Sequence, residues 1–332
     1  MTAPAVIAKN ARLAGVFLFC FSTALTCWAD TFHPDFLIKR MIAATSALNY
    51  EGVFVYHRGN QIDSMRIIHK LNGDTELERL VSLSGPAREV IRKGDEVKCL
   101  FEDDKEVMVE KIEPKDFFSF GLKTPIEDIA AHYRLQIAGR ARIAGREAVL
   151  ISIVPASSDR FAYQLAVDTE HGLLLKSAVY GRDRRVLEQV QFAAIAIGHD
   201  IALSEFNPQI GGDGYTWYTS ERAVKSSNHT RDGQLWAAQW LPDGFKMRNE
   251  MTQRFADVTS PVSHLVYTDG LAMVSIFIEE DSPRAAPAAE AFSSLGAVSA
   301  LSVKQKNHLI TVVGELPPPT LQRIAASVGK ID

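Results

Sequence analysis

The sequence is poor in cysteine. Its 332 residues include only three, at Cys20, Cys27 and Cys99. If residues 1–29 are removed on export, Cys99 alone is left. A single cysteine excludes an intrachain disulfide and argues against a cysteine-based metal site. Cys99 lies in an apolar, strand-like run, which favours a small core side chain over a reactive thiol.

The sequence also has no excess of positive charge. Its formal net charge is −4 at pH 7, and the only charged residues before Asp30 are Lys9 and Arg12. Removing these two positive charges takes the formal net charge from −4 to −6. An acidic chain of this kind argues against nucleic acid as the main partner.

Long apolar runs are absent after Asp30, but the N-terminus has the features of an export signal. An apolar stretch at 13–21 follows two basic residues, and the small residues Cys27 and Ala29 stand at positions −3 and −1 of a cleavage site. We predict a signal peptide over 1–29. An uncleaved anchor is the alternative, since the uncharged run is at the lower length limit for spanning a bilayer. The rest of the chain is expected to be soluble and outside the cytoplasm.

Catalytic motifs are missing as well. The sequence contains no G-x-S-x-G, no phosphate-binding P-loop, no G-x-G-x-x-G after a strand and no H-E-x-x-H, and its nine histidines are scattered. We therefore predict no catalytic residue, no metal site and no cofactor. An exported enzyme of another kind is kept as a minor alternative.

What the sequence does contain is a β-meander over 49–92. Turn residues separate its strand-length pieces at Asn72-Gly73-Asp74 and at two similar glycine-containing sites. Met65 and Ile67 are two residues apart and share one face of a strand, and Leu77 shares a face with Val81. The pattern predicts antiparallel strands with one apolar side.

Helical periodicity precedes this meander. Apolar residues recur every three or four positions over 34–48, and Pro34 suits a first helical turn. About ten antiparallel strands and a second helix, starting near Thr124, are expected before residue 205. A sheet this large curls or closes. The fold class is thus α+β, a large curled antiparallel sheet covered by helices.

A change of composition marks the boundary between two domains. Residues 205–234 hold Pro208 and the run Gly211-Gly212-Asp213-Gly214, which predict a linker. The predicted organisation is one domain over 30–204, a linker over 205–234 and a smaller α+β domain over 235–332. The smaller domain is expected to end in a helix that Thr320 caps.

Several segments together resemble the MucB/RseB family of periplasmic regulators of the sigma-E envelope-stress response. In the first domain they are Asn49-Tyr50-Glu51-Gly52-Val53-Phe54-Val55-Tyr56, Ser64-Met65-Arg66-Ile67 and Arg88-Glu89-Val90. In the second they are Leu241-Pro242-Asp243-Gly244-Phe245, His264-Leu265-Val266-Tyr267-Thr268-Asp269-Gly270-Leu271 and Val312-Val313-Gly314-Glu315-Leu316-Pro317. The hairpin around Gly172 is similar to that of LolA/LolB lipoprotein carriers.

The resemblance implies a fold and a function. The first domain would be a LolA/LolB-like half-barrel with a lipid-accepting cleft. The second would help to bind the periplasmic part of a membrane-anchored anti-sigma factor and shield it from site-one proteolysis. Lipid or lipopolysaccharide would release the complex. A homo-oligomer is left open, and a periplasmic lipid or lipoprotein carrier is the alternative function.

Two sets of site residues follow as hypotheses. An apolar cleft can hold acyl chains, since each buried methylene contributes about 0.8 kcal/mol, although a fully packed core is the rival interpretation. The cleft candidates are Phe54, Met65, Ile67, Leu77 and Val81. The candidates for contact with an acidic partner segment are Lys246, Arg248 and Arg254.

Overall fold

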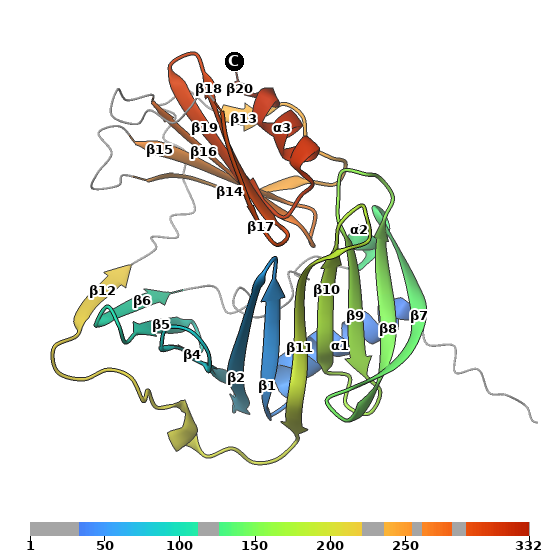
Figure 1. Ribbon diagram of the computed structural model, residues 1–332, viewed down its shortest axis with the longest axis vertical. Coiled ribbons are helices and arrows are strands. Elements are labelled where there is room, and N and C mark those ends of the chain that lie inside the picture. The colour runs from blue at the N-terminus through green and yellow to red at the C-terminus, as the bar shows by residue number, and fades with distance from the viewer. Residues whose placement is uncertain (1–32, 112–125, 221–235, 254–260, 281–289, 332) are drawn as a thin grey trace, which may run out of the picture. The chain divides into compact units, whose positions relative to one another are not determined.

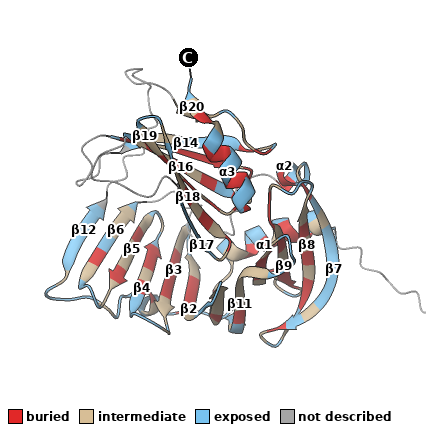
Figure 2. Ribbon diagram, turned by 45° about the horizontal axis from the view of Figure 1, so that its top comes forward, coloured by how far each residue is buried: buried red, intermediate tan, exposed pale blue. Residues whose placement is uncertain are grey.

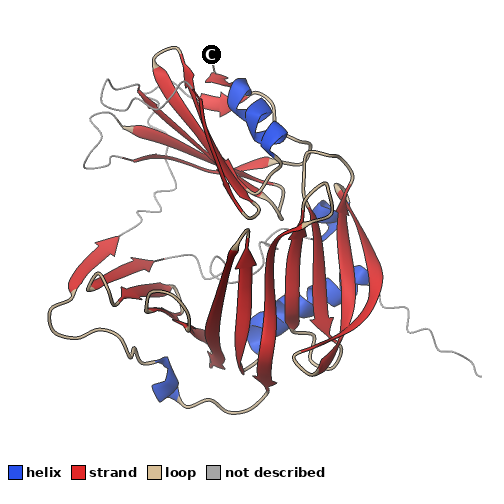
Figure 3. Ribbon diagram, in the orientation of Figure 1, coloured by secondary structure: helices blue, strands red, loops and turns tan. Residues whose placement is uncertain are grey.

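Strands dominate the protein, as Figure 3 shows for the computed structural model. The structure describes residues 33–111, 126–220, 236–253, 261–280 and 290–331. The predicted signal peptide and the predicted start of the second helix at Thr124 lie outside these residues. Within them, no helix is long and apolar enough to cross a membrane.

The largest element is a twelve-stranded sheet that does not close on itself (Figure 1). Its spatial order is β12-β6-β5-β4-β3-β2-β1-β11-β10-β9-β8-β7, and all neighbours are antiparallel except β12 and β6. Its strands are β1 Tyr50–Arg58, β2 Gln61–Asn72, β3 Thr75–Ser82, β4 Arg88–Lys93, β5 Glu96–Phe101, β6 Glu106–Lys111, β7 Tyr133–Ile143, β8 Arg146–Pro155, β9 Ala162–Asp168, β10 Leu174–Tyr180, β11 Val186–Ile197 and β12 Thr216–Ser220.

Tight turns connect the strands of the predicted meander. Asn72 pairs with Thr75 across a two-residue loop, and Gly73 in that loop has φ +62°. A positive φ costs glycine nothing, so the sequence fixes this turn and with it the register of β2 on β3. The register pairs Ile67 with Leu80 and Ile68 with Arg79.

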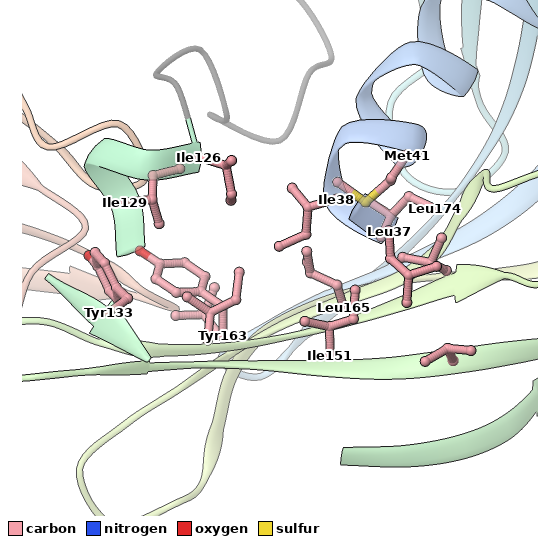
Figure 4. Packing of buried hydrophobic residues seen from close by; sticks show 14 of the residues in the cluster. Leu37, Ile38, Met41, Ile126, Ile129, Tyr133, Ile151, Tyr163, Leu165 and Leu174 are labelled. Carbon is pink, nitrogen blue, oxygen red and sulfur yellow. The ribbon is translucent and has the colours of Figure 1, made fainter. Parts of the chain in front are cut away.

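Helix α1, Pro34–Ala47, lies across one face of the sheet. Its buried residues Leu37, Ile38 and Met41 recur at helical spacing and point toward Ile151 and Leu165 on the strands (Figure 4). Fully burying side chains of this size stabilises the fold by roughly 1.5–3 kcal/mol each. The short helix α2, Ile126–Ala130, adds Ile126 and Ile129 to the same core.

The other face of the sheet is covered along β2 to β5 by the segment after β11. This segment includes the 3₁₀ helix Leu203–Phe206, and Ile201 and Phe206 pack on Ile68 and Leu77. It continues into β12, which pairs with β6 in parallel. The stretch predicted as a linker, 205–234, therefore contains a strand of the large sheet. Its glycines and its one proline, Pro208, suggested a linker, but the run around Trp217 consists of good strand formers.

A buried ion pair fastens this covering segment to the sheet. Arg79 and Glu89 are 1% and 2% exposed, and Arg79 Nη2 donates to Glu89 Oε1 at 2.7 Å. Two further groups of this pair form hydrogen bonds with the covering segment. Arg79 Nη1 donates to the carbonyl of Glu205, and Glu89 Oε2 accepts from the backbone N–H of Gln209. Burying a charged group costs free energy, and these hydrogen bonds offset much of that cost.

A second, six-stranded sheet follows in the order β14-β15-β16-β19-β18-β17. Its strands are β14 Lys246–Gln253, β15 Val262–Thr268, β16 Met273–Glu280, β17 Glu290–Leu295, β18 Val298–Gln305 and β19 His308–Gly314. Helix α3, Pro318–Ser327, packs Leu321 and Ile324 onto it, and β13 Trp236–Ala238 pairs with β20 Val328–Lys330. Burial alternates along the strands, as expected for one covered face (Figure 2).

The predicted turn at Thr268-Asp269-Gly270 joins β15 to β16 and is held by the Asp269 side chain. Asp269 Oδ1 accepts from the backbone N–H groups of Leu271 and Ala272. Its other oxygen accepts from Arg160 Nε at 2.7 Å and from the Tyr133 hydroxyl at 2.9 Å. This carboxylate is buried and fully paired, which is the condition for burying a charge.

The fold class is confirmed, with a large open antiparallel sheet, few helices and a smaller sheet with its own helix. The limits of the two domains, 30–204 and 235–332, stay a prediction. One detail of the prediction is wrong. Thr320 does not cap the last helix, because Pro317 is its N-cap residue and the Thr320 hydroxyl donates to the carbonyl of Asp159.

We expect Glu89→Ala to lower the free energy of unfolding by about 3–5 kcal/mol, because it leaves Arg79 charged, buried and unpaired. Replacing both residues at once, Arg79→Met with Glu89→Leu, should restore most of this loss. Urea unfolding of the two variants checks the prediction. Equal stability of Glu89→Ala and wild type would contradict it.

Candidate functional site

An apolar cavity lies between helix α1 and the large sheet. It encloses about 690 Å³ of empty space, part of which is open to solvent. The lining residues are Met41, Ile42, Thr45, Ser46, Tyr50, Phe54, Ile67, Leu173, Leu174, Leu175, Lys176, Ser177, Val190 and Phe192.

The wall of the cavity depends on a close approach between β1 and β11. A Cβ at Gly52 would lie 2.5 Å from the carbonyl oxygen of Ala194 and 3.0 Å from the ring of Phe192. Glycine is therefore required at this position. The register shifts one residue later, between Val53 and Phe54, and brings Phe54 opposite Phe192 with ring centroids 5.9 Å apart. Such a bulge re-aims side chains.

Two of the five predicted cleft residues, Phe54 and Ile67, line this cavity. Met65 packs in the same apolar cluster without lining the space. Leu77 and Val81 do not belong to this face. Ile67 is paired with Leu80, so alternation along β3 turns Leu77 and Val81 to the other side of the sheet.

Most of the lining was missed from the sequence. The residues Leu173 to Ser177 follow the hairpin at Gly172, and Val190 and Phe192 come from β11. The available signal was the apolar stripe of the helix over 34–48, since Met41 and Ile42 come from it. What the stripe could not show is which strands it meets.

Tyr50 connects the cavity to a buried polar cluster. Its ring stacks on His69 at 4.8 Å, with 12° between the planes. His69 Nδ1 lies 2.8 Å from the carbonyl oxygen of Leu48, which can only accept, so Nδ1 carries the proton. Burial lowers the pKa of His69 and raises the pKa of the Tyr50 hydroxyl. Both groups are thus uncharged at neutral pH.

Glu78 completes this cluster, in register with His69 on one side and Arg92 on the other. It is 2% exposed, and Oε1 has no hydrogen-bond partner among the described residues. Arg92 instead pairs with Glu76. Burial raises the pKa of Glu78 to about 8, against the attraction of Arg92. The face of the sheet that forms the cavity therefore buries a carboxyl group that is mostly protonated at pH 7.

The predicted basic residues lie at the edge of the smaller sheet. Lys246 and Arg248 are both exposed on β14, and Lys246 lies 3.8 Å from Asp128 Oδ2. An exposed pair of this kind contributes little to stability. Arg254 lies outside the described residues. The structure therefore brings Lys246 and Arg248 onto one edge strand.

The arrangement is suited to binding. Among the described residues, no group of three histidine, cysteine or acidic side chains is placed to hold a metal ion. Cys99 is partly buried, and burial raises the pKa of its thiol, which disfavours the reactive thiolate. The cavity offers mostly apolar surface, and in the part of its lining that the structure describes Lys176 is the one ionisable side chain apart from Tyr50. Such a site favours the alkyl part of a ligand.

Glu78 predicts a pH dependence of stability. A glutamate in the unfolded chain has a pKa of about 4.3. Between that pH and about 8 the folded protein holds a proton that the unfolded chain has released. The free energy of unfolding therefore falls as pH rises through this window. We expect Glu78→Gln to gain about 4 kcal/mol on wild type between pH 5 and pH 8.5.

Denaturant unfolding at the two pH values measures this difference, with Glu147→Gln, an exposed position on β8, as the control. The control should follow wild type at both pH values. A Glu78→Gln variant with the same offset from wild type at pH 5 and pH 8.5 would show that Glu78 is not protonated in the folded protein.

Known proteins are similar to this chain over most of its length. A family model described as MucB/RseB N-terminal domain matches residues 34–210, and one described as MucB/RseB C-terminal domain matches residues 230–329. The sequence is 29% identical to the sigma factor AlgU regulatory protein MucB of Pseudomonas aeruginosa, over 88% of this chain and 89% of that protein. It is 26% identical to the sigma-E factor regulatory protein RseB of Escherichia coli K12, over the same shares.

A solved structure agrees with these relatives. It is the complex of MucA and MucB from Pseudomonas aeruginosa, which the chain matches with a TM-score of 0.71 at 26% identity. The match covers 90% of this chain and 99% of that one. The relatives are named as regulatory proteins, not as enzymes. Since the two family models together span most of the sequence, this chain belongs to the MucB/RseB family.

Proposed function

We propose that this protein is a periplasmic negative regulator of a sigma-E-type envelope-stress response. It would bind the periplasmic part of a transmembrane anti-sigma factor. The observation that carries the proposal is the match over 99% of a chain solved as a complex of MucA and MucB. A related complex is described as MucB with MucA(peri), again with a TM-score of 0.71.

Binding would act by shielding. A site-one protease must reach an accessible stretch of the anti-sigma factor, and a bound regulator covers that stretch. While the anti-sigma factor is intact, the sigma factor stays sequestered. This action needs surface complementarity and no catalytic group, in keeping with the binding character of the site. We therefore prefer a binding function to the alternative of an exported enzyme.

The cavity supplies the releasing site in this proposal. Lipid or lipopolysaccharide would place acyl chains against Phe54, Ile67 and Phe192, with Met65 behind them. A ligand can release a partner only if it binds the unpartnered form better, and the coupling then works equally in both directions. The lining is mostly apolar, and each methylene of an acyl chain buried against it would contribute about 0.8 kcal/mol.

A division of labour supports the regulator over the alternative. A periplasmic lipid or lipoprotein carrier needs only the cavity, which belongs to the large sheet. The second sheet with its own core and helix is unnecessary for a carrier. We assign it to partner binding, with the first domain over 30–204 and the second over 235–332. Lys246, Arg248 and Arg254 are proposed to face acidic residues of the partner.

The function is tested by protease protection. The purified protein should protect the periplasmic segment of the anti-sigma factor from the same bacterium against its site-one protease. Arg248→Glu should weaken protection about tenfold, because it places like charges together at the interface. Lys306→Glu, an exposed turn residue on the same sheet, is the matched control and should protect as wild type does.

Two failures have different meanings. If the wild-type protein gives no protection, the regulatory function is contradicted. If Arg248→Glu protects as well as wild type, only the assignment of the basic residues is rejected.

The releasing site is tested by filling it. Thr45 lies on α1 at the cavity, and a tryptophan there would occupy space that an acyl chain needs. We expect Thr45→Trp to weaken binding of a fluorescent C16 fatty acid about tenfold or more, since even two excluded methylenes are worth about 1.6 kcal/mol. Ala43→Trp, exposed on the same helix, should bind as wild type does. Equal binding by the two variants would place the acyl chain elsewhere.

A further inference from the structure

Four strands form the edges of the two large sheets among the described residues. They are β12 and β7 of the twelve-stranded sheet, and β14 and β17 of the six-stranded sheet. The outer side of an edge strand presents a row of unpaired N–H and C=O groups, which is a template for another chain. Proteins commonly protect such edges with charges, bulges or short strands.

Three of these edges carry a protecting feature. Strand β7 has a bulge at Ile137 and Gly139 and exposed arginines at Arg134 and Arg142. Strand β14 has a bulge at Met247 and two exposed cations. Strand β12 is five residues long and is held by a parallel ladder, the less stable kind.

Strand β17 has no bulge, and its single charged residue, Glu290, stands at its first position. Its six residues pair with β18 in unbroken antiparallel register. After Glu290 its sequence is Ala291-Phe292-Ser293-Ser294-Leu295, with no charge and no proline, and these five residues are all exposed. The strand behind it is rigidly placed, because β18 also pairs along most of its length with β19.

A row of buried apolar side chains across this sheet ends at an exposed side chain on β17. Phe292 is in register with Leu301, which is in register with Val312 and, through it, with Ile276. Those three side chains are buried, whereas Phe292 is 51% exposed. An apolar residue on one more strand would continue this row and cover Phe292.

We propose that β17 binds an extended stretch of the anti-sigma factor as a seventh strand of the sheet. This inference rests on the function proposed above and names the mode of partner binding. The outward N–H and C=O groups of β17 favour an extended polypeptide as ligand. A lipid lacks a matching series of donors and acceptors, and the backbone groups of a helix are already hydrogen-bonded within the helix. Main-chain hydrogen bonds and a pocket for alternate side chains are how strand addition achieves affinity and specificity.

Strand addition also gives the shielding a physical basis. A segment whose backbone is paired to β17 cannot offer the same N–H and C=O groups to a protease. The residue facing Phe292 would be apolar, and its neighbours on the strand would face the small side chains of Ala291 and Ser293.

The turn after β17 shows which of its N–H groups point outward. Leu295 pairs with Val298 across a two-residue loop, and Gly296 has φ +64°. The pair that flanks such a loop exchanges hydrogen bonds, and the next pair does not. The N–H of Ser294 therefore points away from β18, and its hydroxyl lies 3.2 Å from that of Ser299.

This geometry defines a test. Ser294→Pro removes one outward N–H while sparing the ladder to β18, because proline is tolerated where the N–H of an edge strand faces outward. We expect it to weaken capture of the purified periplasmic segment of the anti-sigma factor about tenfold or more. Ser294→Ala keeps the N–H and should capture within about twofold of wild type.

Hydrogen exchange on the unmodified protein gives a second readout that does not depend on a variant folding. The amides of Phe292 and Ser294 should become protected when the segment binds. Unchanged exchange at both amides, or wild-type capture by a folded Ser294→Pro variant, would overturn the proposal. So would protection in the protein alone that grows with its concentration, which would assign the edge to a second copy of this chain.

Capture and amide protection together distinguish a failure of strand addition from a failure of the proposed regulatory function. If wild-type protein fails to capture the segment at all, the regulatory function is contradicted. If wild type captures the segment while the β17 amides stay unprotected, the function stands and the strand-addition mode is rejected.

Discussion

The structure depends on one helix lying against a sheet that never closes. The apolar stripe of α1, from Leu37 to Ala44, must be buried, and the large sheet curls around it while leaving β12 and β7 as open edges. Side chains pack densely where the helix meets β8 and β9. Toward β1, β10 and β11 the same helix leaves space, and this space is the cavity. Incomplete filling by one helix thus creates the site.

The opposite face of the sheet is fixed differently. There Ile201 and Phe206 of the covering segment pack on the sheet, and the buried pair of Arg79 and Glu89 holds the segment through Glu205 and Gln209. The two faces therefore have distinct tasks. One is fastened by a buried ion pair, while the other keeps a mostly apolar, partly empty surface. The fastened face can hold the strands in place, while the cavity on the other face can take up a ligand that affects partner binding.

Sequence reasoning went far where the physics is local. The turn at Asn72-Gly73, the helix over 34–48 and the alternation of the strands all follow from neighbouring residues, and together they gave the fold class. The prediction failed where strand pairing decides which face of the sheet a side chain occupies. Leu77 and Val81 alternate correctly, yet only the register of β2 on β3 shows that they face away from the cavity. The strand at Thr216–Ser220 needs β6 as a partner, and the buried Glu78 needs the whole cluster around Tyr50. None of these is encoded within a short window.

The central claim is that filling the cavity and holding the anti-sigma factor oppose each other. Calorimetry of the wild-type protein with the periplasmic segment, alone and after saturation with a C16 fatty acid, measures this directly. We expect the fatty acid to weaken segment binding, and the segment to weaken fatty-acid binding by the same factor. Identical segment affinity in the presence and absence of a bound fatty acid would contradict it.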